Sequence, residues 1–145
     1  MNDDTLLPPS SSSTSTTSST STTTSFASAS ASPPVLPHHK LLAYGVARSL
    51  LLAVLACRIS DTELRNQATR AAKSACLNCA EGAGRVSRAD KARAFAIARA
   101  EAVEAAAAVE IAALCGDAAA GPAREVPHLA HRLVGMLTRL CRPGA

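Results

Sequence analysis

Polar residues recur every three or four positions between residues 67 and 81, and this spacing restricts the segment to an α-helix. Positions three and four apart lie on the same side of a helix. One edge of this helix therefore carries Gln67, Arg70, Ser74, Asn78 and Glu81. The neighbouring stripe is apolar and mostly small, with Leu64, Ala68, Ala71, Ala75 and Cys79. The combination predicts a helical bundle with an internal polar seam beside its core.

The rest of the chain favours the same fold class. The 145 residues include one Tyr, two Phe and no Trp, and no segment alternates between polar and apolar residues, so a sheet is not expected. Residues 10–32 are almost entirely Ser and Thr, and prolines follow at positions 33, 34 and 37. We predict a disordered tail over residues 1–37 and one folded domain over residues 38–145.

Four helices are predicted in the folded domain. Ser60 and Glu63 form a capping-box pattern, and Ser87 precedes Asp90 in a second N-terminal cap. Gly82 and Gly116 fit the positions that end a helix, and Pro127 fits a helix start. The predicted helices span residues 41–59, 61–81, 88–115 and 127–142. Short connections between them predict an all-α, antiparallel up-down four-helix bundle.

The first predicted helix has more apolar surface than one core requires. Its core stripe consists of Ala43, Val46, Ala47, Leu50, Val54 and Cys57. Leu51, Leu52 and Leu55 lie away from that stripe and predict a second contact, with another subunit.

Metal and cofactor sites are not expected. The Cys76-x-x-Cys79 pair lies near the end of a helix, where the dipole raises a thiol pKa, and no second pair completes a zinc site. We interpret both cysteines as small core residues. Glu125-x-x-His128 is a single copy of the di-iron helix motif and contains Pro127. No cofactor is predicted.

The sequence also shows no known catalytic motif and no pattern typical of a secretory signal or a membrane span. The chain has no nucleophile elbow or phosphate loop, and Gly82-Ala-Gly84 follows no strand, so we predict that the protein is not an enzyme. Asp3 and Asp4 stand where a secretory signal carries basic residues. Arg48 and Arg58 interrupt the apolar stretch at 41–59, which argues against a membrane span. We predict a cytoplasmic protein.

The folded domain is basic. All 15 Lys and Arg residues follow the tail, against 9 of the 11 acidic residues. Basic side chains on the third and fourth helices are candidates for binding nucleic acid: Arg88, Lys91, Arg99, Arg132, Arg139 and Arg142. With almost no aromatic residues available to stack on bases, binding through phosphates would be sequence-tolerant and salt-sensitive.

The motif Asn78-Cys-Ala-Glu81-Gly82-Ala-Gly84-Arg85, with Gln67, Arg70 and Ser74 before it, resembles the bacterial four helix bundle protein family. Proteins of this family were first noticed as open reading frames inside intervening sequences of 23S ribosomal RNA genes. The similarity continues with Phe95, Ala98 and Glu104 and then with Leu133-x-Gly135-Met136-Leu137, and covers the chain from about residue 41 onward.

The resemblance implies a basic, ring-shaped homopentamer. It also implies kinship with the accessory variability determinant of diversity-generating retroelements, a non-enzymatic protein that binds nucleic acid and a reverse transcriptase. Two functional hypotheses follow. The first is a nucleic-acid-binding accessory protein, assisting such a reverse transcriptase, and the second is a structural or scaffolding homo-oligomer without a nucleic-acid role.

The polar seam has two interpretations as well. Gln67, Arg70, Ser74, Asn78, Glu81 and Glu104 would either hydrogen-bond across the bundle or line a groove for a partner or ligand. We favour the first, in which Arg70 offsets Glu81 or Glu104 and fixes the helix register.

Overall fold

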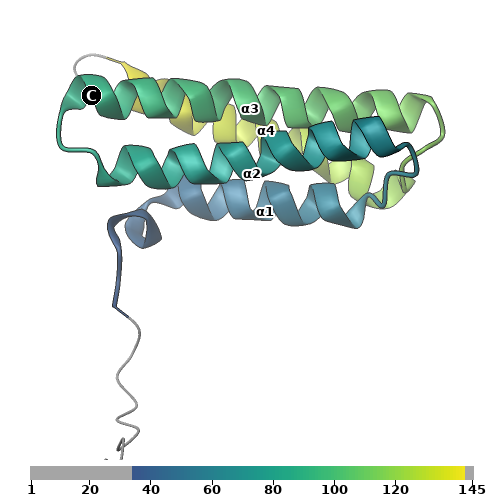
Figure 1. Ribbon diagram of the computed structural model, residues 1–145, viewed down its shortest axis with the longest axis horizontal. Helices are drawn as coiled ribbons and strands as arrows, with labels where there is room; N and C mark the ends of the chain where they lie inside the picture. The colour runs from purple at the N-terminus through teal and green to yellow at the C-terminus, as the bar shows by residue number, and fades with distance from the viewer. Residues whose placement is uncertain (1–33, 143–145) are drawn as a thin grey trace, which may run out of the picture. The chain divides into compact units, whose positions relative to one another are not determined.

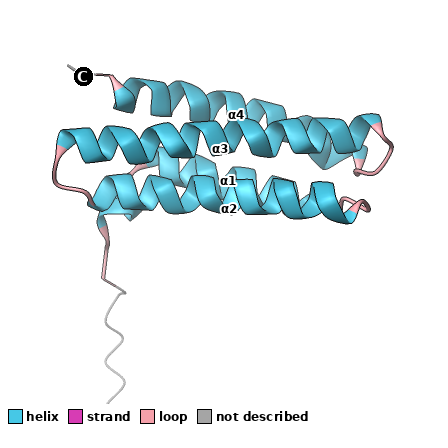
Figure 2. Cartoon of the chain, turned by 45° about the horizontal axis from the view of Figure 1, so that its top comes forward, coloured by secondary structure: helices cyan, strands magenta, loops and turns pink. Residues whose placement is uncertain are grey.

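The computed structural model describes residues 34–142, and every regular element in this range is helical (Figures 1 and 2). A short 3₁₀ helix, η1, precedes four α-helices. Their bounds are Pro37–Lys40 for η1, Leu42–Ala56 for α1, Thr62–Gly84 for α2, Arg88–Leu114 for α3 and Ala120–Cys141 for α4. The predicted disordered tail, residues 1–37, lies almost entirely outside the described residues.

The helices run alternately up and down and form a four-helix bundle, which confirms the predicted fold class (Figure 1). Both α1 and α3 pack against α2 and α4, and the most extensive interface joins α2 to α3. Within the described bundle α2 and α4 do not contact each other, so they are diagonal. None of the helices between residues 34 and 142 combines the length and hydrophobicity needed to cross a membrane.

Alanine dominates the core. Most buried residues of α2 and α3 are alanines, which lets these helices approach closely, and the largest fully buried side chains are Leu50, Leu133 and Leu137. All six residues predicted for the core stripe of the first helix are buried. Among the extra leucines of α1, Leu52 is 64% and Leu55 is 50% exposed.

The start of α2 differs from the predicted capping box. Asp61 is the N-cap, and its carboxylate accepts a hydrogen bond from the backbone amide of Leu64 at 2.7 Å. Ser60 instead lies in the connection, where its hydroxyl donates to the Asp117 carboxylate at 2.5 Å. A carboxylate is a stronger acceptor than a hydroxyl and favours the positive end of the helix dipole, which explains why Asp61 takes the cap.

Gly82 does not end α2, because the helix continues to Gly84. Gly82 is buried, and a Cβ atom added to it would lie 2.5 Å from Cε1 of Phe95. The glycine is therefore required by close packing of α3 and not by a left-handed backbone. The cap predicted for the next helix is confirmed, since Ser87 accepts from the amide of Asp90 at 3.1 Å.

The last helix begins seven residues earlier than predicted. It starts at Ala120, and Pro127 lies inside it. Proline removes one helical hydrogen bond, but Ala123, Val126 and Ala130 are buried around it. Their packing outweighs the local preference for a break. Gly116, with φ of 80°, ends α3 as predicted.

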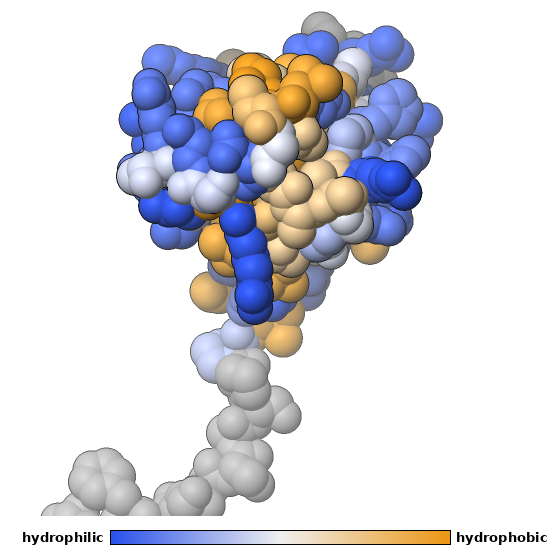
Figure 3. Space-filling model, turned by 90° about the vertical axis from the view of Figure 1, so that its right-hand side faces the viewer, coloured by the Kyte–Doolittle hydropathy of each residue, from blue (hydrophilic) through white to orange (hydrophobic). Residues whose placement is uncertain are grey.

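Backbone hydrogen bonds join the α1–α2 connection to the α3–α4 connection. The amide of Ser60 donates to the carbonyl of Asp117 at 2.9 Å, and the amide of Ala119 donates to the carbonyl of Cys57 at 2.8 Å. Figure 3 views the molecule from this end and shows a band of hydrophobic residues between hydrophilic ones. Leu114, the last residue of α3, lies at the same end of the bundle and is 88% exposed.

Candidate nucleic-acid interface

The six basic residues predicted to bind nucleic acid do not form one surface. Three of them lie along the edge between α3 and α4. Arg88 donates from Nη2 to the backbone carbonyl of Arg142 at 3.3 Å. Arg99 lies close enough to Cys141 for its charge to lower the pKa of that thiol, although burial raises this pKa overall.

Arg132 and Arg139 lie on another side of α4. Arg139 lines a groove between the end of η1, the start of α1 and the end of α4, together with Lys40 and Leu42. Arg132 lies two turns earlier on the same side of α4 and is exposed. Lys91 is half-buried on α3. The structure therefore spreads the predicted set over two sides of α4.

The polar edge of α2 lies at the surface, not inside the bundle. The described residues include no buried polar or charged side chain. Nδ2 of Asn78 donates to the carbonyl and the hydroxyl of Ser74, at 2.9 and 3.2 Å, within the same helix. Glu81 forms an ion pair with Arg85, also within α2.

Contact across the bundle is limited to one pair of this set. Nε2 of Gln67 donates to Oε1 of Glu104 on α3 at 3.4 Å. Arg70 forms no ion pair with either Glu81 or Glu104 among residues 34–142. The prediction of an internal polar seam is therefore wrong. The alternative, in which the polar edge of α2 lines a groove, fits the geometry better.

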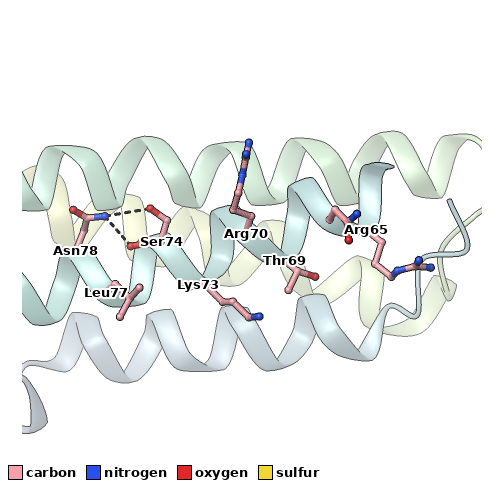
Figure 4. A pocket seen from close by; sticks show the side chains of 8 residues that line it. Arg65, Thr69, Arg70, Lys73, Ser74, Leu77 and Asn78 are labelled. Carbon is pink, nitrogen blue, oxygen red and sulfur yellow. Dashed lines mark hydrogen bonds between the residues drawn. The ribbon is translucent and has the colours of Figure 1, made fainter. Parts of the chain in front are cut away.

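A shallow groove of about 590 Å³ follows the outer surface of α2. We name this surface the α2 face and define it by the eight residues that line the groove: Arg65, Asn66, Thr69, Arg70, Lys73, Ser74, Leu77 and Asn78. Figure 4 shows that Arg70 points toward the α3 side of the helix and Lys73 toward the α1 side, with the groove between them. Three of these residues, Arg70, Ser74 and Asn78, were predicted to belong to the seam, whereas Arg65 and Lys73 were not predicted to belong to any site.

Charge is distributed unevenly around α2. The groove has three cationic residues and no acidic one. The nearest acids on α2 itself flank it, with Glu63 before the groove and Glu81 after it. Between described side chains the structure has one ion pair, and it neutralises Glu81 through Arg85. The groove of the α2 face is therefore lined by cationic side chains without an acidic one, and Glu63 lies at its border, in the adjoining groove that shares Asn66 and Arg70.

The cysteine pair behaves as core, as predicted. Cys76 and Cys79 are buried. Burial raises the pKa of both thiols, and for Cys79 burial together with the neighbouring Cys76 raises the pKa to about 12. A protonated thiol is a poor nucleophile and metal ligand. Within residues 34–142 no three His, Cys, Asp or Glu side chains are grouped closely enough to hold a metal ion.

The raised thiol pKa predicts a loss of stability in alkaline solution. The unfolded chain releases the Cys79 proton near about pH 8.5, whereas the folded chain holds it up to about pH 12. The resulting stabilisation is complete below the lower pKa and is lost as the pH rises through the higher one. Thermal unfolding followed by circular dichroism should show a Tm that falls less steeply above about pH 9 in Cys79→Ala than in the wild type. Cys115→Ala, at an exposed position, should keep the wild-type slope, and equal slopes in all three proteins would contradict the prediction.

Comparison with known proteins places the bundle in a family. The sequence profile of the 23S rRNA-intervening sequence protein family matches residues 40–139, which include the last residue of η1, all of α1 to α3 and all but the last two residues of α4. The chain belongs to this family. No curated protein matches the chain.

The family match covers the structural features described above. The matched residues contain the complete α2 face, the Gly82–Phe95 contact and five of the six predicted basic residues, with Arg142 beyond the match. Membership in the 23S rRNA-intervening sequence protein family accounts for the fold that the motif at residues 78–85 predicted.

Proposed function

We propose that the protein is a non-enzymatic, oligomeric accessory protein of the cytoplasm that binds nucleic acid through its basic surface without sequence specificity. A reverse transcriptase of a diversity-generating retroelement is the protein partner that we propose on the basis of the resemblance given above, and a homopentamer is the proposed assembly. The binding of nucleic acid can be tested without knowing the protein partner or the assembly.

The unneutralised positive charge of the bundle is the observation that carries this proposal. The 15 basic residues exceed the 9 acidic residues that follow the tail, and a single ion pair joins described side chains. Arg70, Lys73, Arg99, Arg132 and Arg139 therefore keep their charge available to a polyanion. Repetition of these charges around an oligomer would strengthen the field.

Sequence-independent binding follows from the scarcity of exposed Phe, Tyr and Trp side chains that could stack on bases. Among residues 34–142, Tyr44 and Phe95 are the only members of the group Phe, Tyr and Trp. Phe95 is buried, and Tyr44 is half-buried, with its ring centroid 4.7 Å from that of His38. Neither can present a free ring for base stacking, which leaves phosphate contacts.

A salt titration tests the proposal. For two or three phosphate contacts, the affinity for a mixed-sequence DNA duplex should fall about 10- to 40-fold between about 50 and 200 mM salt. Fluorescence anisotropy with labelled DNA and RNA measures this, and a duplex of scrambled sequence should bind equally well. Absence of binding at about 50 mM salt, where phosphate contacts are strongest, would refute it.

A structural or scaffolding homo-oligomer is the second candidate function. The exposed apolar side chains of α1 and α2 favour it, because Leu52 is 64% and Leu77 is 70% exposed. A protein that forms a defined oligomer in light scattering, yet fails to bind nucleic acid at low salt, would support this alternative over the first.

A further inference from the structure

The α2 face combines the chemical groups that contact a phosphate backbone. Arg70 and Lys73 supply positive charge at its two sides. Between and beside them, Asn66, Thr69 and Ser74 supply amide and hydroxyl donors. Arginine, lysine, hydroxyl and amide side chains make most protein contacts to phosphate oxygens.

We propose that the α2 face is the primary contact surface for the nucleic-acid backbone, with Arg70 and Lys73 as its cationic contacts. This inference rests on the nucleic-acid-binding function proposed above and adds the place where binding occurs. It moves the site away from the arginines of α3 and α4, which the sequence pattern had favoured.

Two cations of the neighbourhood have different roles. Arg65 is held by the turn before α2, since Nη1 donates to the carbonyls of Ile59 and Ser60 and Nη2 donates to the hydroxyl of Thr62. Its guanidinium therefore fixes the edge of the groove and is not free to follow a ligand. Arg48 on α1 lies close enough to Cys76 for its charge to lower the pKa of that thiol, against the larger effect of burial. It extends the positive field toward α1.

The surface suits a polyanion better than an acidic protein. Protein interfaces have an apolar centre, but Leu77 is the one large apolar residue that lines this groove. The helix rises about 12 Å from Arg65 to Lys73. Duplex DNA carries about seven charges over that length. The number of phosphate contacts is therefore limited by the two free cations of the face, Arg70 and Lys73.

The test compares two pairs of substitutions that remove the same charge on opposite sides of the bundle. Arg70→Gln/Lys73→Gln changes the α2 face, and Arg132→Gln/Arg139→Gln changes α4, which is diagonal to α2. All four side chains are exposed, so both variants should keep the wild-type Tm to within a few degrees.

Two phosphate contacts contribute about 1.8 to the slope of log affinity against log salt. With the full chain and a mixed-sequence DNA duplex, Arg70→Gln/Lys73→Gln should lower this slope by about 1.8 and weaken binding on the order of 100-fold at about 50 mM salt. The α4 variant should lower the slope by less than about 1. Poly-glutamate should compete with the duplex only weakly.

Each other outcome has a separate meaning. Equal losses in both variants, or a larger loss in the α4 variant, would overturn the α2 face as the primary contact while leaving the binding function intact. Strong competition by poly-glutamate would overturn the preference for a phosphate backbone over an acidic protein. If the wild type does not bind at all, the proposed function fails and the inference fails with it.

Discussion

Leu133→Ala should destabilise the bundle by about 2–5 kcal/mol, the largest effect that we expect from a single substitution. Leu133 is fully buried and is one of the three largest side chains of the core that are fully buried. The buried residues of α3, against which α4 packs, are mostly alanines, which have no side-chain freedom to move into the space that the substitution leaves. The cavity should therefore remain open and the cost should lie toward the upper part of the range.

Urea unfolding monitored by circular dichroism measures this cost. Leu77→Ala is the matched control, because it deletes the same atoms from a side chain that is 70% exposed, and it should change the free energy of unfolding by less than about 0.5 kcal/mol. A loss of under about 1 kcal/mol for Leu133→Ala would show that the helices collapse into the cavity.

Gly82→Ala should destabilise the protein by about 1–3 kcal/mol, although alanine is the better helix former. The new Cβ would lie 2.5 Å from Cε1 and 2.7 Å from Cδ1 of Phe95. Phe95 is only 5% exposed, so its ring cannot turn into solvent. The clash must then push α2 and α3 apart along their interface, which is the most extensive one in the bundle.

Gly84→Ala separates this clash from the effect of helix propensity. Gly84 lies in the last turn of the same helix, and no atom is within 4 Å of an added Cβ. This control should be neutral or stabilising by up to about 1 kcal/mol. The combination Gly82→Ala/Phe95→Leu should recover part of the lost stability, and failure to recover any would refute the role of the Phe95 ring.

Helical periodicity was sufficient to predict the parts of the fold that depend on one helix. The core stripe of α1 and the Ser87 cap were predicted correctly, because burial and capping follow from residues close in sequence. Pro127 and Gly82 were misinterpreted for the opposite reason. Each has a local meaning as a helix boundary, but packing by other helices overrides it at both positions.

The candidate site was harder to predict than the fold. A polar edge beside an apolar stripe has the same spacing whether it faces another helix or solvent, so Arg70 and Asn78 were assigned to the interior. The small side chains of the core bring α3 close to α2, and the longer polar side chains of that edge remain at the surface. Lys73 lacked a signal of its own, because a single surface lysine is common in any helix.

The amides of Ser60 and Ala119 donate to Asp117 and Cys57, and so connect distant parts of the chain. Such contacts form only after most of the chain is in place, so this end of the bundle should assemble late in folding. Once formed, it holds both helical hairpins together, whereas at the other end α2 and α3 are connected by the short, exposed segment 85–87. Local opening should therefore begin at the α2–α3 turn and reach the joined connections last.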